Sequence, residues 1–112
     1  MNVGAQLSVT DMRRASRCPI DYPVIAEHHD HGDVKMHLCN ISANGFMVDD
    51  AQELERGQRV IVRLPVVGRI EAHVMWQRDK RAGLQFERII RLDDFLAMIE
   101  ELQPNPKLRR QR

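Results

Sequence analysis

Hydrophobic and polar positions alternate with a period of two over most of the chain from Tyr22 onward. Successive side chains of a strand point to opposite faces, so this period predicts strands with one buried face. It appears over residues 22–26, 34–38, 46–48, 60–64, 70–76 and 84–86. In the clearest run, the side chains expected to face the core are Ile70, Ala72, Val74 and Trp76. We therefore expect six short strands.

Glycines fall at the ends of these expected strands, where turns require residues with a permissive backbone. The glycines concerned are Gly32, Gly45, Gly57, Gly68 and Gly83. Six strands with one apolar face each predict an antiparallel barrel or sandwich. Closure into a barrel also removes exposed edges. The expected fold is therefore all-β, a six-stranded antiparallel β-barrel over residues 22–88 with one short C-terminal helix.

The period changes to a helical one near the C-terminus. Apolar residues at helical spacing are Leu92, Phe95, Leu96, Ile99 and Leu102. Asp93 and Asp94 suit the N-terminal end of a helix dipole, and Pro104 and Pro106 end the element. We expect a short helix over residues 91–102 that packs on the barrel.

The 112 residues suffice for one domain. We expect a flexible arm over residues 1–11, the domain over residues 12–102 and a disordered basic tail over residues 103–112. No apolar run reaches the roughly 20 residues that span a bilayer, and the N-terminus lacks a signal-peptide core. A cytoplasmic protein without membrane insertion is expected.

Composition narrows the possible ligands. The net charge of +1 argues against a long polyanion, so nucleic acid is not an expected partner. Of the 17 basic residues, 14 are arginines, whose forked head groups bind phosphates and guanine edges. A small anionic ligand therefore fits the composition.

Two short motifs flank the first two expected strands, and their order along the chain is a stronger signal than either motif alone. Arg13 and Arg17 form an R-x-x-x-R pair ahead of the first expected strand, and Asn40, Ser42 and Gly45 form an N-x-S-x-x-G turn after the second. Together with the later segments HVMWQ and GLQF, these residues resemble the PilZ family over about residues 12 to 102. The resemblance implies a PilZ-like split barrel that binds cyclic di-GMP.

The resemblance also implies roles for the arginines. Arg13 and Arg17 would grip the ligand from a switch segment over residues 12–21, with Arg14 as a helper. Guanine offers N7 and O6 as adjacent acceptors to an arginine fork, and phosphate oxygens accept the same fork through charge-assisted bonds. One cyclic dinucleotide or a stacked pair would be compatible with this charge density.

The second motif would supply polar contacts. Asn40 and Ser42 lie two apart, so on an extended strand their side chains would share one face. Asn40 would bind the Watson–Crick edge of guanine and Ser42 a base or phosphate oxygen. Gly45 would permit a positive φ or a close approach of the backbone to the ligand. Many family members carry Asp in place of Asn40, so weaker binding is expected here.

The leading hypothesis is a cyclic di-GMP receptor that orders its N-terminal arginine segment on binding and signals to a separate effector protein. The first alternative is a PilZ-fold protein–protein adaptor that binds no nucleotide. The second is a nucleic-acid-binding barrel that uses the basic tail Arg109, Arg110 and Arg112.

The clustered histidines, the two cysteines and the tryptophan are expected to have structural roles. The histidine-rich segment 27–33 could bind a metal, but it straddles a predicted hairpin and is expected to be a solvated polar turn. Cys18 and Cys39 are expected to be free thiols. Trp76 is expected in the core. No catalytic arrangement, metal or cofactor is predicted.

Overall fold

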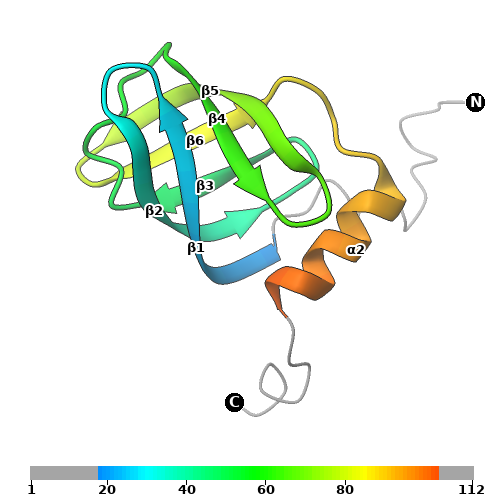
Figure 1. Cartoon of the computed structure of the whole chain (residues 1–112). Coiled ribbons are helices and arrows are strands. Elements are labelled where there is room, and N and C mark those ends of the chain that lie inside the picture. The colour runs from blue at the N-terminus through cyan, green and yellow to red at the C-terminus, as the bar shows by residue number, and fades with distance from the viewer. Residues whose placement is uncertain (1–17, 104–112) are drawn as a thin grey trace, which may run out of the picture.

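A computed structural model of the chain describes residues 18–103 (Figure 1). The expectations for the arm and tail and for Arg13, Arg14 and Arg17 lie outside these residues. The described elements are β1 (Cys18–His28), β2 (Gly32–Ile41), β3 (Gly45–Asp49), β4 (Arg59–Leu64), β5 (Gly68–Arg78), β6 (Arg81–Phe86) and α2 (Leu92–Leu102). The six expected strands and the helix are all present.

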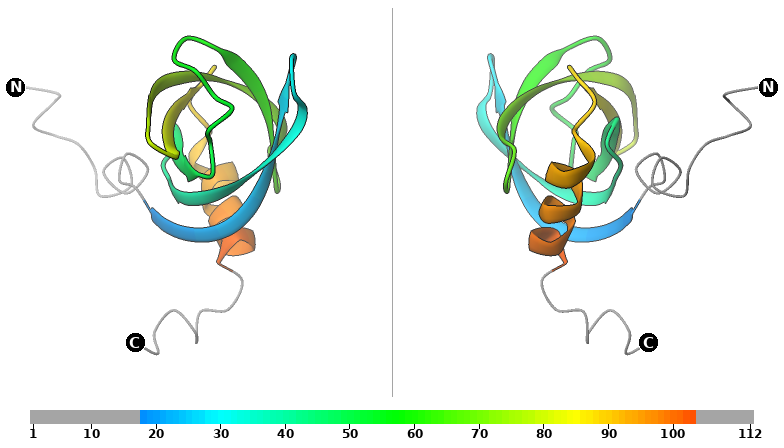
Figure 2. Two further views of the ribbon diagram at one scale, coloured as in Figure 1. Left: turned by 90° about the vertical axis from the view of Figure 1, so that its left-hand side faces the viewer. Right: turned by 90° about the vertical axis from the view of Figure 1, so that its right-hand side faces the viewer.

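The strands form a closed antiparallel barrel in the order β1-β2-β3-β6-β5-β4, which confirms the predicted fold. Closure depends on the second half of β1, where Ile25, Ala26 and Glu27 pair with β4. The first half of β1 pairs with β2 alone. Figure 2 shows the resulting ring of strands from its two ends.

Alternating residues of every strand fill the barrel. On β4, Val60, Val62 and Leu64 are buried, whereas Ile61 and Arg63 face outward. The largest fully buried side chains are Phe46, Phe95, Leu38, Ile41, Leu54, Ile70, Ile90, Met98, Val48, Val60, Val62 and Val74. One contiguous core therefore holds both the barrel and the helix.

Helix α2 lies at one end of the barrel, beside the start of β1 (Figures 1 and 2). It buries Phe95, Met98 and Leu102, and the Gln103 side chain donates a hydrogen bond to the carbonyl oxygen of Pro19. One of the apolar residues expected to pack on the barrel does not do so, because Leu96 is 36% exposed. The buried residues of the helix follow the spacing i, i+3 and i+7, which gives a narrow apolar face, and Leu96 lies at the edge of that face.

Candidate functional site

The turn between β2 and β3 is built around the hydroxyl of Ser42. Its Oγ accepts hydrogen bonds from the backbone N–H groups of Asn44 at 3.2 Å and Gly45 at 3.3 Å. The N–H of Ser42 donates to the carbonyl oxygen of Gly45 at 2.8 Å. Ser42 is only 3% exposed. Its hydroxyl therefore shapes the turn, and the structure offers no exposed hydroxyl for the ligand contact expected from the sequence.

Gly45 lets two strands approach closely. Its φ is not positive, so of the two roles expected for this glycine, a positive φ or a close approach of the backbone, the first is not found. A Cβ at this position would lie 2.2 Å from the carbonyl oxygen of Leu84 on β6. Gly45 pairs with Gln85 of that strand. The close approach is therefore to β6, and any larger residue would push β3 and β6 apart.

Asn40 lies at an irregularity of β2. The register against β3 shifts between Leu38 and Asn40, and the Asn40 side chain contacts the sulfur of Met47 at 3.9 Å. Asn40 is half-buried, whereas Ser42 is buried in the turn beyond the strand. The expectation that these two side chains share one face assumed an extended segment, and that segment ends at Ile41, before Ser42.

Trp76 lies on the outside of the barrel, which corrects its expected place in the core. The register of β5 against β6 shifts between Val74 and Trp76. Beyond this shift Met75 is 49% exposed and Trp76 39% exposed, while Val74 is only 2% exposed. A Cβ on Gly83 would lie 2.1 Å from the indole Nε1, so the ring packs against that glycine. The signal in the sequence was Gly83 itself, since glycine within a strand often marks a bulge or a close contact.

Two surface hollows adjoin Trp76. The first, of about 210 Å³, lies beside the β2–β3 turn and is lined by Asn44, Gly45, Met75, Trp76, Gly83, Leu84 and Gln85. The second, of about 560 Å³, is lined by Met47, Asp49, Trp76, Arg78, Asp79, Lys80 and Arg81. The exposed indole therefore separates a turn-side hollow from a hollow with three cationic side chains.

One of these cations is already paired. Arg81 Nε donates to Asp49 Oδ1 at 2.9 Å. The pKa of Asp49 is lowered, first by a hydrogen bond from the Cys39 thiol and also by Arg81. Arg78 and Lys80 remain exposed beside this pair. Arg78, Lys80 and Arg81 exceed the two carboxylates of the hollow, Asp49 and Asp79, by one charge, which favours an anionic or electron-rich ligand.

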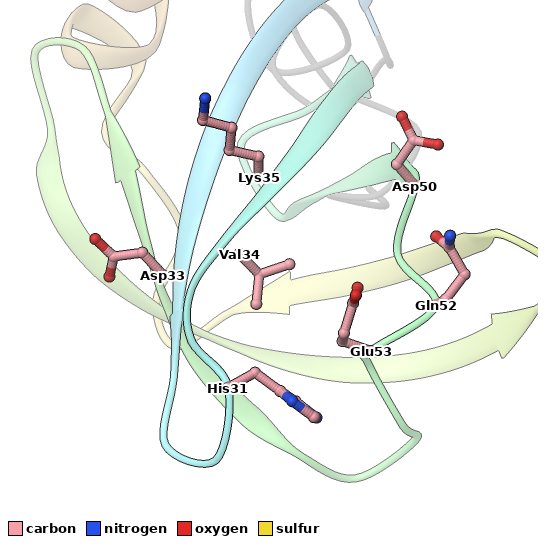
Figure 3. Close-up of a pocket in the computed structure, with 7 residues that line it drawn as sticks. All are labelled: His31, Asp33, Val34, Lys35, Asp50, Gln52 and Glu53. Carbon is pink, nitrogen blue, oxygen red and sulfur yellow. The ribbon is translucent and has the colours of Figure 1, made fainter.

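A third hollow of about 550 Å³ has the opposite character. It is lined by His31, Asp33, Val34, Lys35, Asp50, Gln52 and Glu53. Figure 3 shows that these side chains come from the β1–β2 hairpin on one side and from the segment after β3 on the other. Three carboxylates against one lysine make this hollow a poor site for phosphates.

The histidine-rich segment forms the β1–β2 hairpin, as expected. His28 ends β1, and its Nδ1 accepts from the N–H groups of Asp30 at 3.0 Å and His31 at 3.3 Å. Its Nε2 lies 3.0 Å from the Gln58 side-chain oxygen. Both ring nitrogens of His28 are therefore engaged, Nδ1 within the hairpin and Nε2 with Gln58 in the segment before β4.

Cys18 and Cys39 are free thiols, as expected, and burial raises the pKa of Cys18. Within residues 18–103, no helix has the length and apolar character needed to cross a membrane.

Comparisons with known proteins agree with this geometry. The family model of the PilZ domain matches residues 11–102. Two solved structures are similar in fold: the PilZ domain of CeSA from a cellulose-synthesizing bacterium, and the Bacillus subtilis inhibitor of motility MotI/DgrA. The first has a TM-score of 0.57 at 17% identity and is matched over 80% of this chain and 97% of its own.

The motility inhibitor has a TM-score of 0.55 at 23% identity, over 86% of this chain and 51% of its own, so the chain spans about half of that protein. No curated protein sequence matches significantly. The family match covers most of the chain, including both motifs and the whole barrel. The chain therefore belongs to the PilZ domain family.

Proposed function

We propose that this protein is a cyclic di-GMP receptor whose ligand lies on the outer face of the barrel between the β2–β3 turn and Trp76. PilZ domains are generally cyclic di-GMP receptors or adaptors rather than enzymes. The ligand presents two phosphates and two guanines. The face around Trp76 offers groups that suit both.

The exposed indole of Trp76 is the observation that carries the proposal. An exposed tryptophan on a rigid strand provides a flat surface on which a guanine can stack. The side chain is held against Gly83 and adjoins both the turn and the cationic hollow. A base stacked there would place its phosphates within reach of Arg78 and Arg81.

The first described residues of β1 lie beside this face. Cys18 pairs with Ile41 and Pro19 with Asn40, so the described chain begins next to the second motif. Arg17 is covalently joined to Cys18, and four extended residues reach at most about 14 Å, which bounds the distance from Arg17 to Arg13. This connection supports a clamp in which Arg13 and Arg17 close over the ligand with help from Arg14.

The residues of the second motif would contribute differently. Asn40, half-buried and outside the turn, would contact guanine directly. Ser42 and Gly45 would act indirectly, because they set the shape of the turn and its packing on β6. An amide lacks the full charge of a carboxylate, so guanine N1–H and N2–H would be bound more weakly than by aspartate.

Ligand binding would order the arginine segment, and the ordered segment would present a new surface to a separate effector protein. Ordering costs free energy, so a dissociation constant on the order of micromolar, about −8 kcal/mol, is expected. A PilZ-fold adaptor without nucleotide binding predicts instead that the folded chain gives no heat with cyclic di-GMP.

Calorimetry with the full chain tests the clamp. Arg17→Ala should remove charged hydrogen bonds worth about 1.5–3 kcal/mol, a loss of roughly 10- to 150-fold in affinity. Arg88→Ala is the matched control, since Arg88 is exposed and lies outside the residues that line either hollow beside Trp76. Equal affinities for the two variants would refute the clamp.

A further inference from the structure

Three side chains with metal-binding atoms converge on the outer surface of β2 and β3. His37 and Cys39 lie two apart on β2, and Asp49 pairs with His37 from the end of β3. One ligand atom from each of the three lies within 4.8 Å of the other two, and all three residues are half-buried. His37 and Cys39 lie outside the residues that line the hollows beside Trp76, whereas Asp49 lines the cationic one.

The distances suit a small metal ion. Cys39 Sγ lies 3.1 Å from Asp49 Oδ2 and 4.0 Å from His37 Nδ1. A tetrahedral zinc ion with Zn–S near 2.3 Å and Zn–N or Zn–O near 2.1 Å holds such atoms about 3.6 Å apart. The sulfur–oxygen distance would have to open and the sulfur–nitrogen distance to close, each by about half an ångström. Side-chain rotation alone can supply such movements.

Neighbouring residues already orient two of the three ligands. The Asp21 carboxylate is hydrogen-bonded to His37 Nε2, which leaves Nδ1 directed toward Cys39. Arg81 binds one oxygen of Asp49, and the other oxygen accepts from the Cys39 thiol. Metal-binding histidines in proteins commonly use their second nitrogen in this way, and such partners fix the ring for coordination.

We propose that His37 Nδ1, Cys39 Sγ and Asp49 Oδ2 form a zinc site on the surface of the barrel. Nitrogen, sulfur and oxygen donors together suit zinc, which is borderline in softness and favours four-coordinate geometry. Three protein ligands leave the fourth position for water or a small ligand.

Zinc must displace the thiol proton at this site. Burial, followed by the hydrogen bond to Asp49, raises the pKa of Cys39 to about 11. A coordinating thiol is nevertheless deprotonated by the metal, so zinc binding exchanges the thiol–Asp49 hydrogen bond for two metal–ligand bonds and releases one proton.

The hairpin group His28, His29 and Asp30 also brings ligand atoms together, but it is the weaker candidate. Both nitrogens of His28 are already engaged, one by hairpin N–H groups and the other by Gln58. His29 and Asp30 are exposed and contribute no sulfur. This group supplies a control for the zinc site.

Cobalt(II) titration of the untagged, reduced full chain tests the proposal, because thiolate–cobalt coordination gives a charge-transfer band in the near ultraviolet. We expect the band to saturate at one equivalent and to disappear when zinc is added. It should persist in Cys18→Ser and in His29→Gln and be lost in Cys39→Ser. No band in the wild-type chain, or an unchanged band in Cys39→Ser, would overturn the site.

Two further variants retain the thiol and separate coordination from folding. Asp21→Asn should weaken zinc affinity about 10- to 100-fold through loss of the histidine's partner. His37→Gln should weaken it at least as much. Affinity is measured by competition with a chromophoric chelator, and thermal melting confirms that each variant is folded. Unchanged affinity in folded His37→Gln would refute the assignment, whether or not the chain binds cyclic di-GMP.

Discussion

At the residue scale, the candidate site contains two kinds of side chain. Ser42 and Gly45 are buried and hold the β2–β3 turn against β6. Asn40 is half-buried and Trp76 is exposed, and both lie on strands that carry register shifts. The motif read along the sequence therefore mixes residues that build the site with residues that can touch a ligand.

Trp76→Ala should weaken cyclic di-GMP binding by about 1–3 kcal/mol, since base stacking on an aromatic side chain is worth that much. Binding is measured by calorimetry, and circular dichroism checks the fold. Ile89→Ala is the matched control, because Ile89 is a large exposed apolar side chain outside the residues that line either hollow beside Trp76. Equal effects of the two substitutions would remove Trp76 from the site.

Gly45→Ala should destabilise the barrel by about 1–3 kcal/mol, because its Cβ would overlap the carbonyl oxygen of Leu84 on a neighbouring strand. Gly57→Ala is the comparison: its φ of +92° disfavours a side chain, but the surrounding space is open, so a cost of about 1 kcal/mol is expected. Urea unfolding measures both. A Gly45 variant no less stable than the Gly57 variant would contradict the close-approach explanation.

The sequence predicted the site only in part, and the reason lies in individual residues. Alternation over 70–74 correctly predicted Ile70, Ala72 and Val74 in the core. It failed at Trp76, because at the register shift against β6 both residues after Val74, Met75 and Trp76, are exposed. A bulge depends on the partner strand, and a pattern within one strand cannot reveal it.

At the element scale, an ion-pair cluster connects strands where β1 and β4 close the barrel. Glu27 on β1 accepts from Arg63 of β4 at 2.8 Å and from Arg69 of β5 at 2.8 Å. Arg63 also lies 3.2 Å from Asp33 on β2. The cluster therefore links four strands, and the sequence could not predict it, because its members are brought together only by barrel closure.

This cluster predicts a dependence of stability on pH. The hydrogen bonds from Arg69 and Arg63 lower the pKa of Glu27 from 4.5 to about 2. A lowered folded-state pKa stabilises the protein above the unfolded pKa, and this contribution is lost as pH falls from about 5 toward 2. The melting temperature of Glu27→Gln should therefore be lower than that of the wild type at about pH 6. The difference between the two melting temperatures should be smaller at about pH 3.

The control is Glu100→Gln, because Glu100 is exposed on α2. Its melting temperature should differ from that of the wild type by the same small amount at both pH values. Thermal melts at the two pH values, at low salt, measure the effect. A difference for Glu27→Gln that does not shrink with acid would refute the assignment of the pH dependence to this carboxylate.

At the scale of the whole molecule, the period of two and the positions of the glycines were enough to predict a six-stranded barrel. They could not predict that β1 pairs with both β2 and β4, because pairing between distant strands leaves no local signal. The same topology starts the described chain at Cys18, beside Ile41 at the end of β2 and next to the β2–β3 turn.

The protein contains a single tryptophan, so its fluorescence reports on Trp76 alone. The most direct test is a fluorescence titration of the full chain with cyclic di-GMP. If the ligand stacks on this ring, the emission changes in a saturable manner, with a midpoint on the order of micromolar. Unchanged Trp76 emission from a folded chain at millimolar ligand would contradict the proposed binding face.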